Sequence, residues 1–331
     1  MHLIRHIFLI TVPTLAILFL LLEGLLRAVG YVPYYMNGNA FVPSQNQTIL
    51  YVPRPNFEGL YAGKRVSVNS QGFRGRELAQ EGASVFRVAL IGDSVAFGQG
   101  VEEEETLPAQ LTVRLQRKLN SQVEVVNLGV PGYDTCQEYL RFEESVAKLK
   151  PQTAILVYLD NDTEPSLITV IDGVVISSDV RTRLFGDLRM AARKYSYAYN
   201  LIWTNLQVFK RESSGVNAYS SAVTQRFSED YPGWRRSKAC FADLVSLTRR
   251  KSIRLIVIPF PPMAGLRDTP YPFDRYIRAV CNEAHAAGVE CLNVVPALQD
   301  PRLRLYVSNI EMHPSAEVYA KVAEQIEKIL P

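Results

Sequence analysis

Short runs of β-branched and aliphatic residues recur after residue 85, and they limit the possible folds more than any other feature of the chain. They lack the alternation of apolar and polar residues that marks a half-exposed strand, so we expect strands that are covered on both faces. Segments with helical spacing separate the runs, and strands that alternate with helices form βαβ units and a parallel sheet. The expected strands cover residues 86–91, 123–128, 154–159, 254–260 and 290–294, and the expected helices cover residues 106–120, 134–148, 234–250, 273–287 and 315–330.

Right-handed crossovers between these strands predict an α/β fold for residues 86–330. We expect a three-layer sandwich, in which helices cover both faces of a central, mostly parallel, doubly wound sheet of the flavodoxin-like type. Residues 163–231 interrupt the alternation with a hairpin signal at Asp172-Gly173 and an aromatic-rich helical segment, and they are expected to form a lid-like insertion. Residues 31–85 are expected to form an extended linker with short β elements, in which Arg74 lies at a solvated turn.

An apolar segment predicts a membrane anchor in residues 1–30. Residues 7–22 carry no charge, and two leucines follow after Glu23, which approaches the roughly 17–25 residues of a spanning helix. A cleaved signal peptide is the alternative, but no Ala-x-Ala cleavage site follows the apolar run. We therefore favour a single-pass anchor with a cytoplasmic amino terminus and with the remaining chain in the periplasm or the extracellular space.

Composition argues against several classes of function. The net charge of +3, without a basic stripe or a nucleic-acid-binding motif, argues against a nucleic acid partner. The four cysteines lack Cys-x-x-Cys spacing and only four histidines are present, so we expect no zinc site, no other metal and no cofactor. The cysteines allow one disulfide, whose pairing the spacing does not define.

The first expected strand ends in a Gly-Asp-Ser turn, which places Ser94 just beyond its carboxyl end, where open α/β sheets bind ligands. A strand-to-helix turn with Asp93 or Ser94 as the N-cap is the purely structural interpretation. The turn is not the Gly-x-Ser-x-Gly elbow of α/β-hydrolases, because Ala96 occupies the place of the second glycine.

A serine that attacks a carbonyl carbon needs a base, and histidine is the usual one because its pKa lies near neutrality. His313 lies in a loop between the last strand and the last helix, at the expected carboxyl edge of the sheet. Charge that develops on the carbonyl oxygen needs fixed donors. The backbone N–H of Gly132, after the second strand, and the amide of Asn161, after the third, are the candidates.

In these segments the sequence resembles the SGNH, or GDSL-like, hydrolase family of esterases, lipases and carbohydrate acyl esterases. The four sequence blocks of that family occur here in the family's order, and the resemblance extends over about residues 86–330. The matching segments are residues 92–98 (Gly-Asp-Ser-Val-Ala-Phe-Gly), 127–132 (Asn-Leu-Gly-Val-Pro-Gly), 159–162 (Leu-Asp-Asn-Asp) and 311–314 (Glu-Met-His-Pro).

The resemblance implies a role for each candidate residue. Ser94 would be the nucleophile and His313 the base. The backbone N–H groups of Ser94 and Gly132 and the side chain of Asn161 would form the oxyanion hole.

The sequence departs from the family's pattern at two positions. Leu159 stands where the third block usually begins with glycine, and Ile310 stands where the fourth block usually carries the aspartate that orients the histidine. Glu311, Asn309 or a backbone carbonyl could orient His313 instead. We favour Glu311 because it is the only carboxylate in the loop.

The resemblance implies a serine-dependent esterase or acyl esterase that hydrolyses ester bonds. The favoured substrate is an O-acetylated cell-surface polysaccharide, with an acylated lipid as another ester substrate. Two alternatives stay open. One is an O-acyltransferase that acts on extracellular glycans, and the other is a catalytically silent, membrane-anchored binding or scaffold protein.

Overall fold

The computed structural model describes residues 2–33, 39–79, 84–165, 168–171, 174–177, 192, 195–212, 215–308 and 311–331. Its centre is a five-stranded parallel sheet with the spatial order β6-β5-β7-β10-β11. In chain order this is 2-1-3-4-5, the flavodoxin-like doubly wound arrangement, so the predicted α/β fold is confirmed. The strands are β5 (Phe86–Gly92), β6 (Val123–Asn127), β7 (Thr153–Tyr158), β10 (Arg254–Pro259) and β11 (Glu290–Cys291).

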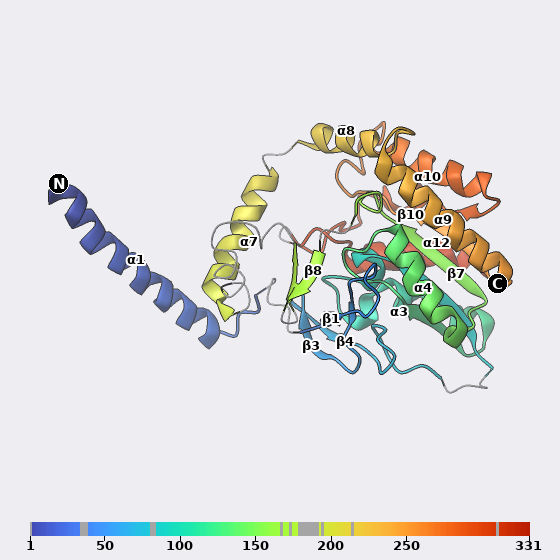
Figure 1. Ribbon diagram of the computed structural model, residues 1–331, viewed down its shortest axis with the longest axis horizontal. Coiled ribbons are helices and arrows are strands. Elements are labelled where there is room, and N and C mark those ends of the chain that lie inside the picture. The colour runs from blue at the N-terminus through green and yellow to red at the C-terminus, as the bar shows by residue number, and fades with distance from the viewer. Residues whose placement is uncertain are drawn as a thin grey trace.

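Helices flank the sheet on both faces (Figure 1). They are α2 (Ser94–Phe97), the 3₁₀ helix η1 (Glu103–Glu105), α3 (Leu107–Leu119), α4 (Thr135–Leu149), α9 (Pro232–Arg250), α10 (Asp274–Ala286), α11 (Val295–Leu298) and α12 (Ala316–Ile329). α3 packs against α12, and α4 packs against α9. Strands β5, β7 and β10 are buried over most of their length, as their non-alternating sequences predict.

The last strand is shorter than the sequence predicts. β11 ends at Cys291, whereas the expected strand continues to Val294. The Asn293 side chain accepts a hydrogen bond from the Val295 backbone N–H at 3.0 Å, which starts α11 there. A local side-chain bond therefore shapes the turn between the strand and α11.

Residues 31–85 do more than connect the amino-terminal helix to the sheet. Phe41, Tyr51 and Tyr61 are buried in a second apolar cluster around Phe97, three residues after Ser94. Aromatic side chains of the expected linker therefore support the turn that carries Ser94. The segment forms two antiparallel hairpins, β1 (Phe41–Pro43) with β2 (Tyr51–Pro53) and β3 (Glu58–Tyr61) with β4 (Lys64–Ser67).

Arg74 is buried, so the predicted solvated turn is wrong for this side chain. Its guanidinium donates to the backbone carbonyl oxygens of Phe97 (3.1 Å), Gly98 (2.6 Å) and Val101 (2.8 Å), and it pairs with Glu103 at 3.1 Å. The end of α2 and the turn after it direct these carbonyls toward one place, where a single guanidinium with five N–H donors can satisfy them.

The insertion after β7 contributes a hairpin and two helices to the described residues. β8 (Ile168–Ile171) and β9 (Val174–Ser177) pair as predicted, although the Asp172-Gly173 turn lies outside the described residues. The helices are α7 (Tyr197–Glu212) and α8 (Val216–Arg226). The Tyr219 hydroxyl of α8 donates to Asp160 Oδ2 at 2.8 Å, which fastens α8 to the loop after β7. The lid function of this insertion stays a prediction.

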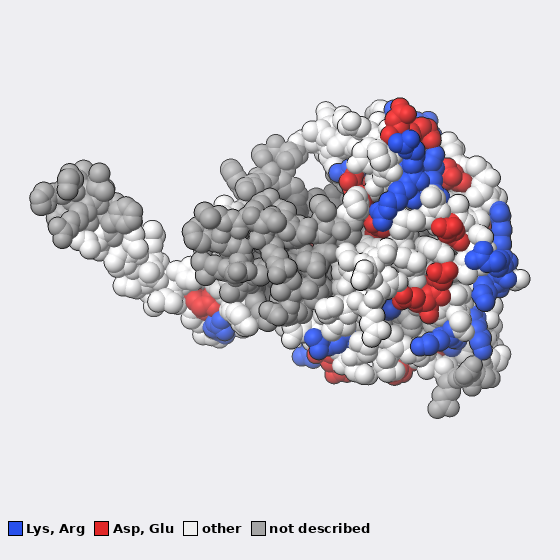
Figure 2. All heavy atoms as spheres, in the orientation of Figure 1, with Lys and Arg blue, Asp and Glu red and all other residues white. Residues whose placement is uncertain are grey.

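α1 (His2–Ala28) projects away from the α/β domain (Figure 1). Within it, Leu9–Ala28 has a mean hydropathy of 2.3 and is 6% buried, so it is long and apolar enough to cross a membrane. A signal sequence has the same length and composition. Figure 2 shows uncharged atoms along most of the described part of α1, whereas acidic and basic side chains intermingle on the visible face of the α/β domain.

All four cysteines form disulfides, one more bond than the sequence led us to expect. Cys136–Cys240 joins α4 to α9, and Cys281–Cys291 joins α10 to β11. The first pairing bridges 104 positions of sequence, and only the packing of α4 against α9 reveals it.

The loop after β6 passes close to α2 at Gly129. A Cβ at this position would lie 2.2 Å from the Phe97 nitrogen and 2.6 Å from the Ala96 carbonyl carbon. Because these are backbone atoms, relief requires a shift of the helix or the loop. We expect Gly129→Ala to lower the free energy of unfolding by about 1–3 kcal/mol, as measured by urea denaturation.

Gly215→Ala is the matched control, since nothing lies within 4 Å of a Cβ built at Gly215. We expect it to cost about 1 kcal/mol or less, because Gly215 is the N-cap of α8. Equal losses in the two variants would show that the close approach at Gly129 does not constrain the loop.

Candidate active site

Ser94 begins α2 directly after the Gly-Asp turn that ends β5. Asp93 caps this helix, because its Oδ1 accepts a hydrogen bond from the Val95 backbone N–H at 2.9 Å. The sequence allowed Asp93 to be a purely structural N-cap, and this cap is present. It is compatible with Ser94 as a nucleophile, because the cap holds Ser94 at the carboxyl end of the strand.

A closed loop before α12 brings His313 to Ser94. The Val307 backbone N–H donates to the His313 carbonyl oxygen at 3.1 Å, and Tyr306 forms an antiparallel bridge with Pro314. The resulting distance between His313 Nε2 and Ser94 Oγ is 2.8 Å, although 219 positions of sequence separate the two residues.

Glu311 lies against the other nitrogen of the His313 ring. Its Oε1 accepts hydrogen bonds from His313 Nδ1 and from the His313 backbone N–H, the latter at 3.0 Å. A proton on Nδ1 leaves the lone pair of Nε2 facing the Ser94 hydroxyl, as a general base requires. Of the groups expected to orient the histidine, Glu311 is the one found at the ring, while Asn309 and Ile310 lie outside the described residues.

Gly100 makes room for Glu311, a contact that the sequence does not indicate. A Cβ at Gly100 would lie 2.6 Å from Glu311 Cγ, and the φ of Gly100 is +84°, in the left-handed region that favours glycine. A glutamate is one methylene longer than the family's usual aspartate, and here it lies one residue closer to the histidine. The space at Gly100 accommodates that difference.

Asn161 follows β7 and lies beside the Ser94 turn. Its Nδ2 is 3.3 Å from Asp93 Oδ2, which is also 3.3 Å from Ser94 Oγ. Burial raises the pKa of Asp93. The loop is closed even though Leu159 replaces the usual glycine, since the Leu159 N–H donates to Asp162 Oδ2 at 2.9 Å and the Asp162 N–H donates to the Leu159 carbonyl at 3.2 Å.

Gly132 lies on the loop after β6, on the opposite side of β5 from β7. This loop is joined to the Ser94 turn where the Val130 N–H donates to the Gly92 carbonyl at 3.1 Å. Within the part of the chain that the structure describes, no protein acceptor takes up the backbone N–H of Ser94 or of Gly132. Both remain available as donors.

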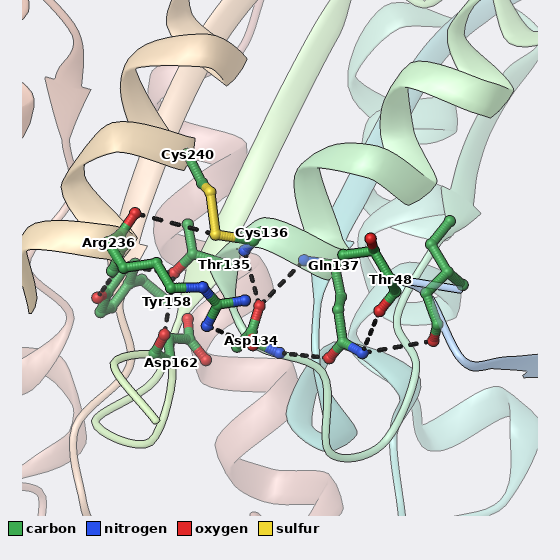
Figure 3. Close-up of polar contacts among 11 residues, drawn as sticks. Thr48, Asp134, Thr135, Cys136, Gln137, Tyr158, Asp162, Arg236 and Cys240 are labelled. Carbon is green, nitrogen blue, oxygen red and sulfur yellow. Dashed lines mark hydrogen bonds and ion pairs between the residues drawn. A yellow bond between two sulfur atoms is a disulfide. The ribbon is translucent and has the colours of Figure 1, made fainter. Parts of the chain in front are cut away.

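Side chains hold the first turn of α4, which follows the loop of Gly132 (Figure 3). Asp134 caps the helix and pairs with Arg236 of α9 at 2.9 Å. Gln137 Nε2 donates to the Thr48 carbonyl oxygen at 2.9 Å. The Cys136–Cys240 disulfide joins the same turn to α9, so the end of this loop is fixed by contacts from several directions.

Thr135 connects the loops after β6 and β7 (Figure 3). Its Oγ1 donates to the Asp162 carbonyl oxygen at 3.4 Å and lies 2.7 Å from Ser237 Oγ. Ser237 Oγ is in turn 2.6 Å from the Tyr158 hydroxyl at the end of β7. The two loops that carry the candidate oxyanion donors are therefore positioned together.

Two buried carboxyl groups near these loops are not among the site residues that the sequence predicts. Burial, together with the neighbouring charge of Asp162, raises the pKa of Glu138 well above its usual range, and burial likewise raises the pKa of Asp162. Among the described residues, neither oxygen of Glu138 has a hydrogen-bond partner. The helical spacing of Glu138, Phe142 and Leu149 could have indicated that Glu138 is buried, because the three side chains share the buried side of α4. The described residues contain no cluster of three or more His, Cys, Asp or Glu arranged to hold a metal ion.

The sequence model of the GDSL-like Lipase/Acylhydrolase family matches residues 90–321, so the chain belongs to this family. None of the curated proteins matches it.

Among solved structures, the chain is similar to a catalytic mutant of Axe2, an acetylxylan esterase from Geobacillus stearothermophilus. The two sequences are 17% identical, the match covers 73% of this chain and 92% of that one, and the TM-score is 0.44. It is also similar to the psychrotrophic esterase EstA from Pseudoalteromonas sp., with 11% identity, coverage of 74% and 98%, and a TM-score of 0.43.

The raised pKa of Glu138 predicts a pH-dependent stability. A carboxyl group whose pKa rises on folding stabilises the fold below its unfolded pKa, here about 4.5, and this contribution is lost as the pH rises through the folded pKa. Glu138→Gln removes the titration and keeps the shape. We expect the melting temperatures of wild type and variant to agree near pH 4 and the variant to be higher by about 2 °C or more at pH 8.

Glu143→Gln, at an exposed position of α4, is the control and should follow the wild-type profile. If Glu138→Gln ran parallel to wild type over the whole range, the raised pKa of Glu138 would be contradicted.

Proposed function

We propose that this protein is a serine-dependent esterase that hydrolyses carboxylic ester bonds. The observation that carries the proposal is the hydrogen-bonded series from Ser94 through His313 to Glu311, with 2.8 Å between Ser94 Oγ and His313 Nε2. This order supports the roles of nucleophile, base and orienting acid in a triad. A catalytically silent scaffold would not need the alignment, so it argues against that alternative.

In the proposed first half-reaction, Ser94 Oγ attacks the ester carbonyl carbon while His313 Nε2 takes the hydroxyl proton and Glu311 stabilises the charged imidazole. The negative charge that forms on the carbonyl oxygen is bound by the N–H groups of Ser94 and Gly132 and by the Asn161 amide. When the tetrahedral intermediate collapses, the leaving alkoxide takes the proton from His313 and departs as the alcohol. An acyl ester on Ser94 remains.

In the second half-reaction, water attacks the acyl carbon and gives a proton to His313. The carboxylic acid leaves, and Ser94 regains its proton. If a sugar hydroxyl replaced the water, the same site would act as an O-acyltransferase. Quantifying free acid against acylated glycan among the products separates the two reactions.

We also propose that α1 anchors the protein and that the α/β domain lies in the periplasm or the extracellular space. The apolar span Leu9–Ala28 supports an anchor, and the two disulfides support an oxidising compartment. The corresponding domain limits are 1–30 for the anchor, 31–85 for the connecting segment and 86–330 for the hydrolase domain, with a lid-like insertion at 163–231.

An esterase at this location meets cell-surface glycans. We therefore propose O-acetyl groups on a polysaccharide as the substrate, and an acylated lipid as the other ester within its reach.

We expect Glu311→Gln to lower kcat/KM for p-nitrophenyl acetate by roughly tenfold to a thousandfold, because the amide cannot stabilise the charged imidazole. Ser94→Ala and His313→Ala should lose more activity, since they remove the nucleophile and the base. Release of p-nitrophenolate gives the rates, and circular dichroism checks that each variant is folded.

Asn309→Ala, in the same loop, is the matched control and should stay close to the wild-type rate. A neutral Glu311→Gln together with a crippling Asn309→Ala would transfer the orienting role to Asn309. If both were neutral while Ser94 and His313 remained essential, the site would be a Ser-His dyad oriented by the backbone.

A further inference from the structure

The outward side of α7 carries an apolar stripe, defined here as Tyr199, Ile202, Trp203 and Leu206. Ile202 is 45% exposed and Leu206 is 48% exposed, and the rings of Tyr199 and Trp203 stack with their centroids 6.2 Å apart. The spacing i, i+3, i+4, i+7 places all four side chains on one side of the helix.

The inward side of α7 is partly polar. Asn200 and Thr204 are buried together with Ala198. A helix on the surface of a water-soluble domain shows the opposite pattern, with its apolar side inward and its polar side in water. Among the α7 side chains whose burial is described, Ile202 and Leu206 are exposed together with Asn205, while Asn200 and Thr204 are buried. Two large apolar side chains on the outward side suit a helix that meets a nonpolar medium at its boundary with water.

Glu23 of α1 holds the start of α7. Its carboxylate accepts hydrogen bonds from the backbone N–H groups of Tyr197 at 3.1 Å and Ala198 at 2.8 Å. Arg27, one turn further along α1, donates to the Tyr195 carbonyl oxygen at 2.6 Å and lies 4.4 Å from the centroid of the Tyr197 ring. The only acidic residue in Leu9–Ala28 therefore caps a helix of the insertion.

The contact between Glu23 and the start of α7 fixes how deep α7 lies in a membrane that α1 crosses. The sixteen uncharged residues 7–22 extend over about 24 Å as an α-helix, close to the roughly 30 Å of a hydrocarbon core, so Glu23 lies at its boundary. Tyr and Trp side chains favour this boundary. Figure 1 shows α7 meeting the C-terminal end of α1 and then diverging from it.

We propose that α7 is an interfacial helix whose apolar stripe lies in the surface of the membrane that α1 spans. This inference rests on the proposed anchoring by α1. A lipid surface is the occupant because α7 starts at the boundary marked by Glu23 and packs against α1, whose apolar side chains are also exposed.

The contact has a consequence for the candidate active site. The insertion leaves the sheet at the end of β7, beside Asn161, and α8 is fastened to Asp160. An α7 that rests on the membrane would therefore keep the site close to the membrane surface, within reach of esters attached to that surface.

Tryptophan quenching by lipid tests this proposal. The chain has two tryptophans, Trp203 on the stripe and Trp234 in the core of the α/β domain. Full-length protein is reconstituted in phosphatidylcholine vesicles with and without brominated acyl chains, which quench indole fluorescence on contact. We expect a bromine-dependent loss of fluorescence in Trp234→Phe and in wild type, and none in Trp203→Phe.

Two further variants test the stripe itself. Ile202→Gln combined with Leu206→Gln should weaken the quenching of Trp203. Val113→Gln, at a residue of α3 that is also 45% exposed, is the matched control and should leave it unchanged. Hydrolysis of a soluble activated ester at the wild-type rate shows that these variants are folded.

Alkaline carbonate extraction of the same vesicles reports separately on α1. Protein that resists extraction while its Trp203 stays unquenched would overturn the interfacial α7 and leave the anchor intact, and a second copy covering the stripe would give this result. Protein released by carbonate would show that α1 does not anchor the chain, and would overturn both proposals.

Discussion

Hydrogen bonding between the parallel strands β5 and β7 fixes where the candidate catalytic groups can lie. Their register places Gly92 opposite Val157, so the segments that follow leave the sheet side by side. This is the point where the strand order reverses, because β6 lies on one side of β5 and β7 on the other, and open α/β sheets bind ligands there. The 3.3 Å contact between Asp93 and Asn161 follows from this register.

Groups far from the sheet edge support the turn at Ser94. A buried guanidinium is costly unless its donors are satisfied, and Arg74 meets this condition by donating to carbonyl groups in the last residue of α2 and just beyond it. The aromatic residues of the amino-terminal hairpins pack around Phe97 from the same helix. Gly100, three residues after the end of α2, leaves room for the Glu311 side chain, whose carboxylate binds the His313 ring. A disturbance in residues 31–85 should therefore reach the site through backbone packing.

The sequence predicts the sheet and its order of elements well, because non-alternating apolar strands and capped helices are local patterns. Ser94, Gly132, Asn161 and His313 could be selected because each lies just past a strand or just before a helix, where the fold brings loops together. Glu311 could be favoured as the only carboxylate in its loop.

The misplaced or missed features depend instead on contacts between distant parts of the chain. Arg74 is held by backbone carbonyls, Gly100 faces a side chain from another loop, and Cys136 meets Cys240 through helix packing. Glu138 occupies a stripe position that the helical period assigns to an apolar residue. Residue type and spacing do not encode these contacts.

Reaction with a fluorophosphonate probe tests most directly whether Ser94 is a nucleophile activated by His313. Such a probe phosphonylates an activated serine, and peptide mass spectrometry locates the adduct. We expect one adduct on the full-length protein, at Ser94, which is absent from Ser94→Ala and forms far more slowly in His313→Ala. Folded protein that stays unlabelled, or that carries its adduct on another serine, would contradict the assignment.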